Sequence, residues 1–180
     1  MTERAPDVIL TFQVKAYDID VGGVVHNSVY LLWLDDVRTA FMERLETIEA
    51  QVERGYIPVL SKTEISYRRA VKFGDRPVAK MHLTHLSKAR WRISCDFVVG
   101  DAITTQAVQE GCIIDIVSGR PIPVPAPFIR YWEQKQQDDQ NQLGAQGNGT
   151  LSALGSPERE CEILGTAERR HAIPVSTSVG

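Results

Sequence analysis

YDIDVGGVVHNSVYLLWLDDVR, residues 17–38, is the stretch that decides how this chain folds. Its first half places Asp18 and Asp20 ahead of a glycine pair, a combination typical of a tight turn. Its second half begins a series of apolar residues at helical spacing, which predicts a helix over residues 28–45. The stretch therefore indicates a sharp turn that leads into one long helix.

Asp36 is expected to lie on the apolar side of this helix. It stands one turn from Leu32 and Trp33, which belong to the apolar series. An acid in a buried position needs a partner or a function. Asp36 is thus an alternative catalytic acid, or it forms a structural ion pair with Arg38 or with a residue of a second subunit.

Patterns typical of β-strands surround the helix. Strands are predicted at residues 8–17, 57–71, 77–87, 90–99 and 102–117. The alternation slips between Ala107 and Gly111, which suggests a bulge in the last strand. The prolines of GRPIPVP, residues 119–125, are expected to end the sheet. One long helix with about five mostly consecutive strands predicts an α+β fold with an antiparallel sheet.

The composition excludes several functional classes. The chain has 180 residues, 43% of them hydrophobic, enough for one domain with a real core. Its net charge of −3 argues against nucleic acid as a partner. Its three cysteines lack metal-site spacing and are odd in number, so a cytoplasmic location is expected. The first residues lack an apolar segment, so no signal peptide is expected, and no apolar run reaches the ~18 residues that a membrane span needs.

The composition changes at about residue 132. All 13 aromatic residues lie before residue 133, and a segment rich in Gln, Gly and Asp follows. Such a segment buries too little apolar surface to offset its loss of conformational entropy. We therefore predict one domain over residues 1–132 and a low-complexity, mostly disordered tail over residues 133–180.

The turn and the helix start together suggest a catalytic arrangement. Backbone N–H groups in a first helical turn have no internal partner and carry the positive end of the helix dipole. A developing oxyanion binds well there, and a carboxylate a few residues upstream would face the same atom. The alternative is that Asp18 and Asp20 only shape the turn and that Asn27 or Ser28 only caps the helix.

The opening stretch resembles the signature of hotdog-fold thioesterases of the 4-hydroxybenzoyl-CoA and acyl-CoA thioesterase type. The residues that match are Asp18, Asp20, Gly23, Val25, Asn27, Tyr30, Asp36 and Arg38. The resemblance continues to about residue 130. It implies a long central helix wrapped by a curved antiparallel sheet, and a homodimer or homotetramer whose sites are built from two chains.

The resemblance also implies roles for single residues. Asp20 is the expected catalytic carboxylate, and Asn27 is expected to offer its backbone N–H to the thioester carbonyl. His26 stands where many relatives have Asn, so it either takes part in catalysis or is a solvated loop residue. Tyr30 either lines the acyl pocket or belongs to the core. Gly23 is expected beside the substrate, where the turn approaches it.

A basic segment adds a further clue. Residues 68–92 contain eight basic residues and one acid. Such a cluster suits the phosphates of coenzyme A, although single members are equally explained as a solvated face. By the resemblance, Lys88 and Arg90 are the best-placed contacts to CoA, ahead of Arg68 and Arg69.

The expected reaction is hydrolysis of an acyl- or aroyl-CoA thioester to a free acid and CoA. Asp20 would act as nucleophile or as general base on water. No cofactor is expected, because CoA is part of the substrate, and no metal is expected, because the sequence shows no cluster of metal ligands. The alternatives are an acyl-CoA sensor without turnover, an enzyme for acyl-carrier-protein thioesters, and a hydratase that pairs an Asp with a His.

Overall fold

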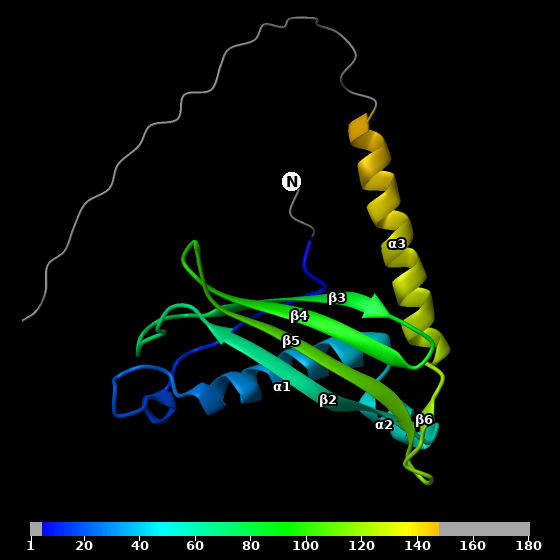
Figure 1. Ribbon diagram of the computed structural model, residues 1–180, viewed down its shortest axis with the longest axis horizontal. Helices are drawn as coiled ribbons and strands as arrows, with labels where there is room; N and C mark the ends of the chain where they lie inside the picture. Colours follow the sequence, from blue (N-terminus) through cyan, green and yellow to red (C-terminus); the bar gives the residue numbers. More distant parts are fainter. Residues whose placement is uncertain (1–4, 148–180) are drawn as a thin grey trace, which may run out of the picture.

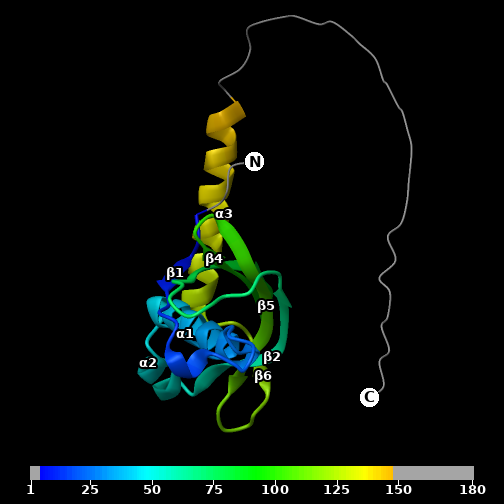
Figure 2. The same ribbon diagram turned by 90° about the vertical axis from the view of Figure 1, so that its left-hand side faces the viewer.

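The computed structural model describes residues 5–147 and confirms the α+β fold, with one long helix lying along a curved antiparallel sheet (Figure 1). The sheet has six strands; five follow the order β1-β3-β4-β5-β2, and β6 pairs with β5. Seen from the side, helix α1 lies within the curve of the sheet (Figure 2). This is the hotdog arrangement that the resemblance implied.

The elements follow the predicted order along the chain. They are β1 (Val8–Thr11), the 3-10 helix η1 (Ala16–Asp18), α1 (Asn27–Leu45), α2 (Ile48–Glu53), β2 (Tyr56–Tyr67), β3 (Val78–Leu86), β4 (Arg90–Val99), β5 (Ala102–Asp115), β6 (Pro121–Ile122) and α3 (Ala126–Gly147). Within residues 5–147, no helix combines the length and the apolar character that crossing a membrane needs.

Two strand predictions needed correction. The first strand ends at Thr11 instead of continuing to residue 17. The Asp18 carboxylate accepts a hydrogen bond from Lys15 N–H at 2.8 Å, which supports a 3-10 turn where a strand was expected. The sheet also continues past the expected stop, because Ile122 pairs with Ile113 between two prolines.

The buried side of helix α1 only partly matches the one that the sequence suggested, since Trp33 is buried as expected but the buried face is shifted toward Leu34. Leu34 and Val37 are buried at the centre of its packed face, whereas Leu32 is 67% exposed. Asp36 is exposed as well, since one helical step of ~100° carries it away from Val37. The expectation that Asp36 lies on the buried stripe was therefore wrong for the single chain.

The predicted bulge in β5 lies elsewhere. Pairing with β4 skips Thr104, because Phe97 pairs with Thr105 and Val98 with Ile103. Between Ala107 and Gly111 the alternation of buried residues is regular. The register with β2 does shift between Gly111 and Glu110, but the extra residue there is Ser61 of β2.

Gly111 is required by close packing. A Cβ atom built at this position would lie 2.5 Å from Trp91 Cε2, and still closer to Trp91 Cζ2 and the Val59 carbonyl oxygen. Trp91 itself is 2% exposed. The indole therefore lies directly against the backbone of β5, and only glycine leaves room for it.

Helix α3 crosses residue 132, after which the predicted tail begins. It runs from Ala126 to Gly147, so residues 133–147 are helical and the boundary at residue 132 falls inside a helix. The remainder of the predicted tail, residues 148–180, lies outside the described residues. The helix starts at the β6 end of the sheet and extends beyond it (Figure 1).

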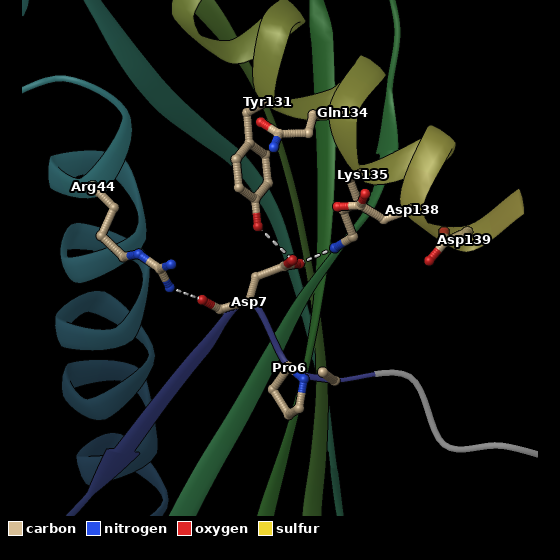
Figure 3. Close-up of a pocket in the computed structure, with 9 residues that line it drawn as sticks. Pro6, Asp7, Arg44, Tyr131, Gln134, Lys135, Asp138 and Asp139 are labelled. Atoms are coloured by element: carbon tan, nitrogen blue, oxygen red, sulfur yellow. Dashed lines mark hydrogen bonds and ion pairs between the residues drawn. The ribbon is translucent and has the colours of Figure 1, made fainter. Parts of the chain in front are cut away.

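A buried ion pair fastens α3 to the rest of the domain (Figure 3). Lys135 pairs with Asp7, and the two side chains are only 8% and 5% exposed. Asp7 also accepts hydrogen bonds from the Tyr131 hydroxyl and from Leu83 N–H, each at 2.5 Å. Arg44 of α1 donates to the Asp7 carbonyl. Asp7 thus joins the N-terminal segment, β3, α1 and α3 at one point.

Candidate active site

The acidic turn is a small hairpin that holds Asp20. Ile19 bridges to Val25, and Asp20 N–H donates to the Val24 carbonyl at 2.9 Å. Asp20 Oδ1 accepts from Gly22 N–H at 2.8 Å and from Val24 N–H at 3.4 Å. Gly23 has a φ of 77°, a conformation that favours glycine. One carboxylate oxygen of Asp20 is therefore fixed on its own turn, and the side chain is only partly buried.

Asp18 has a different role. It is 7% exposed, and its carbonyl accepts the His26 N–H at 2.8 Å while its carboxylate accepts from Lys15. These contacts explain Asp18 as a structural residue that ties the turn to the helix start. Of the two acids, Asp20 is the less buried.

His26 caps helix α1, a role that the sequence prediction assigned to Asn27 or Ser28. Its Nδ1 accepts hydrogen bonds from Ser28 N–H at 3.1 Å and from the Ser28 hydroxyl at 2.8 Å. Its carbonyl accepts the Val29 N–H. The prediction was wrong because histidine is not a common capping residue. Asn27 is the first helical residue, and its N–H takes no part in the cap, which binds Ser28 and Val29.

A cavity of about 200 Å³ lies beside the helix start. Its lining includes Asn27 and Tyr30 from α1 and Tyr67 at the end of β2. The Tyr67 hydroxyl donates to the Asn27 carbonyl at 3.3 Å, and the Tyr30 and Tyr67 rings meet edge to face at 5.2 Å. Asp20 does not line this cavity. A single chain thus places Asn27 and Tyr30 on one cavity, with Asp20 on the neighbouring turn.

Tyr30 belongs to the core and also lines this cavity. It is 2% exposed and contacts the rings of Trp33 and Phe97, so it belongs to the core. It also lines the cavity beside Asn27. Burial raises the pKa of the Tyr30 phenol above its ordinary value, and burial does the same for Tyr67. Both phenols are therefore neutral at physiological pH.

The predicted ion pair between Asp36 and Arg38 does not form. Arg38 instead pairs with Asp35 and donates to Gln109 Oε1 at 3.0 Å. Gln109 is 2% exposed, and its Nε2 donates a second hydrogen bond to the Thr63 hydroxyl. Helical spacing explains the choice of Asp35, because residues three positions apart lie on the same face of a helix and residues two positions apart do not.

The four basic residues that were suggested as contacts to CoA fall into two pairs at opposite ends of β5. Arg68 and Arg69 line the cavity beside Asn27. Arg90 pairs with Cys112 on β5, whereas the Arg68 and Arg69 amides bond to Thr104 on the same strand. At ~3.4 Å per residue, this separates the two groups by ~27 Å. Within one chain, Lys88 and Arg90 are therefore far from the helix start.

Fold and site together define a hotdog protein with an acidic turn ahead of its central helix. The model of the thioesterase-like superfamily matches residues 14–132. The chain belongs to this superfamily, and its general class of reaction is therefore thioester hydrolysis. A comparison with curated protein sequences finds no match.

Solved structures support the same fold. A Staphylococcus aureus protein in complex with CoA is similar with a TM-score of 0.68 and 14% identity, over 74% of this chain and 87% of that one. A 1,4-dihydroxy-2-naphthoyl-CoA thioesterase from Synechocystis has a TM-score of 0.61 and 18% identity, over 67% and 90%. A probable thioesterase from Escherichia coli has a TM-score of 0.63 and 20% identity, over 70% and 96%.

Proposed function

We propose that this protein hydrolyses an acyl- or aroyl-CoA thioester to a free carboxylic acid and CoA. Asp20 is the proposed nucleophile or general base, and the Asn27 N–H is the proposed oxyanion donor. The observation that carries this proposal is the hairpin over residues 19–25, which anchors one oxygen of Asp20 immediately before the helix start. The relatives that are described as CoA thioesterases share this fold.

Two routes are consistent with the proposed roles. In the first, Asp20 takes a proton from water as the water oxygen attacks the thioester carbon. In the second, the carboxylate attacks and forms an anhydride, which water then cleaves. In both, the oxyanion gains the Asn27 N–H as a donor, and the C–S bond breaks to release the CoA thiolate, which takes up a proton. Neither route uses a cofactor.

A homo-oligomer is part of the proposal. Large apolar side chains are exposed on the segments that surround the helix start: Val21, Leu31, Leu32, Tyr67 and Phe73. Exposed apolar groups gathered in this way mark an interface. A second copy that covers them would enclose the cavity beside Asn27 and bring further residues to Asp20. Light scattering of the purified protein is expected to give a dimer or a tetramer.

The test is CoA release from short, medium, long and aromatic acyl-CoA thioesters. Wild type, Asp20→Asn and Asp36→Asn are compared, because the two substitutions remove the same charge, one from the turn ahead of α1 and one from the middle of α1. The Asp20 variant is expected to lose ~100-fold or more in kcat, the size of one general acid–base contribution. Loss only in the Asp36 variant would identify Asp36 as the acid. Binding of acyl-CoA without any release would favour a sensor.

A further inference from the structure

Two hollows on the surface share the same pair of arginines. The first is the cavity of about 200 Å³ at the helix start, and Arg68 and Arg69 form part of its lining. The second is a wider hollow of about 840 Å³ lined by Arg68, Arg69 and residues 101–103 at the start of β5. The arginines therefore stand between the Asn27 end and an open surface region.

The backbone holds this pair firmly. Arg68 N–H and Arg69 N–H both donate to the Thr104 carbonyl, at 2.8 and 3.0 Å. Thr104 is the bulge residue of β5, and its own hydroxyl donates to the Phe97 carbonyl at 3.0 Å. Successive residues of a regular strand point to opposite faces. Here β2 has ended at Tyr67, so both arginines reach the same two hollows.

The two guanidinium groups are available to an anion. Both residues are exposed, and none of the ion pairs found within residues 5–147 includes either of them. Arg92, in contrast, is paired with Glu110 at 2.5 Å. Asp101 is the one acid in the lining of the two hollows. Two adjacent arginines against one carboxylate leave a net positive region beside the positive end of α1.

We propose that Arg68 and Arg69 bind the diphosphate of CoA, in the same chain that supplies Asn27. The thioester end of the substrate then lies in the smaller cavity, and the phosphates lie at the open hollow. Arginine suits this role because its planar fork makes paired hydrogen bonds to phosphate oxygens. This assignment rests on the proposed function for its ligand, and it differs from the Lys88 and Arg90 contacts that the sequence suggested.

The experiment compares three charge-removing double variants of the full chain. They are Arg68→Gln with Arg69→Gln, Lys88→Gln with Arg90→Gln, and, as the matched control, the exposed pair Arg120→Gln with Arg130→Gln. Each is assayed with an acyl-CoA and with the pantetheine thioester of the same acyl group, which carries no phosphate. Binding of CoA and of pantetheine is measured in parallel by calorimetry, and melting temperatures confirm folding.

The Arg68/Arg69 variant is expected to raise KM for acyl-CoA and Kd for CoA by at least about 10-fold, since bonds to charged groups are strong. Relative to wild type, its kcat/KM falls at least about 10-fold further with acyl-CoA than with the pantetheine thioester, because only acyl-CoA carries the phosphates. An equal loss with both substrates, or a loss confined to the Lys88/Arg90 variant, overturns the assignment. If no thioester is hydrolysed, the proposed function fails, while the CoA binding data still decide the role of the arginines.

Discussion

Breaking the buried ion pair between Asp7 and Lys135 is expected to destabilise the whole domain. Lys135→Met keeps most of the side-chain volume and leaves the Asp7 carboxylate buried without its cation. Removing one partner of a buried pair costs about 3–5 kcal/mol. Two donors to Asp7 remain, from Tyr131 and Leu83. We therefore expect a loss near the lower end of that range, about 3 kcal/mol.

This loss converts into a measurable shift in melting temperature. For the roughly 140 residues described, an unfolding entropy of about 2.1 cal/mol/K per residue gives about 0.3 kcal/mol/K. A loss of 3 kcal/mol then corresponds to a fall of about 10 °C in Tm. Calorimetry and urea unfolding of wild type and Lys135→Met measure this difference. Arg130→Met is the matched control, because it removes an exposed positive charge from the same helix.

A double-mutant cycle separates the pair from its surroundings. Asp7→Asn alone leaves the Lys135 ammonium buried and is also expected to destabilise. The combined variant is expected to lose less than the sum of the two single losses, because it buries no unpaired charge. If Lys135→Met behaves like the Arg130 control, with a loss below about 0.5 kcal/mol, the ion pair does not hold α3. Truncation after residue 133 removes Lys135 and is expected to destabilise, whereas truncation after residue 147 keeps it.

Two further predictions concern the core. Gly111→Ala forces a Cβ into Trp91 and the Val59 carbonyl oxygen, so we expect a loss of about 1–3 kcal/mol in urea unfolding. A variant as stable as wild type would show that the indole moves aside at no cost. Cys95 is 1% exposed, and burial raises the pKa of its thiol from 9.0 to about 12. We therefore expect that this thiol does not react with a thiol reagent at pH 8 in the folded protein. Wild type and Cys95→Ala should then titrate alike when folded and differ by one thiol in denaturant.

Helix α1 shows how far the sequence prediction reached. Its apolar spacing predicted its position within one residue, because helical periodicity is a local property. Which side of the helix is buried was not predictable to the same degree. Neighbouring faces differ by a single step of ~100°, and only packing against the sheet decided that Leu34 is buried and Leu32 is exposed.

Helix α3 shows where local reasoning failed. Beyond Trp132 its sequence is polar, which suggested a tail. The helix docks through Phe128, which is buried in the core, and through Tyr131, which packs on Phe41. Lys135 adds an ion pair with Asp7, which lies 128 positions earlier in the chain. No local pattern reports a contact at that separation. The low-complexity prediction for residues 148–180 stays a prediction.

The sequence by itself determined the acidic turn, the helix that follows it and the antiparallel sheet, because these depend on local spacing and residue type. It also placed Asp20, Asn27 and Tyr30 in one motif. The tertiary structure decided which basic residues share a cavity with Asn27. Antiparallel pairing sets Arg68 and Arg69 beside Thr104 and Arg90 beside Cys112, at opposite ends of β5. Arg68 and Arg90 belong to one basic segment of the sequence, yet they are separated by most of the length of β5. Asn27 and Tyr67 are 40 positions apart, yet they are in contact.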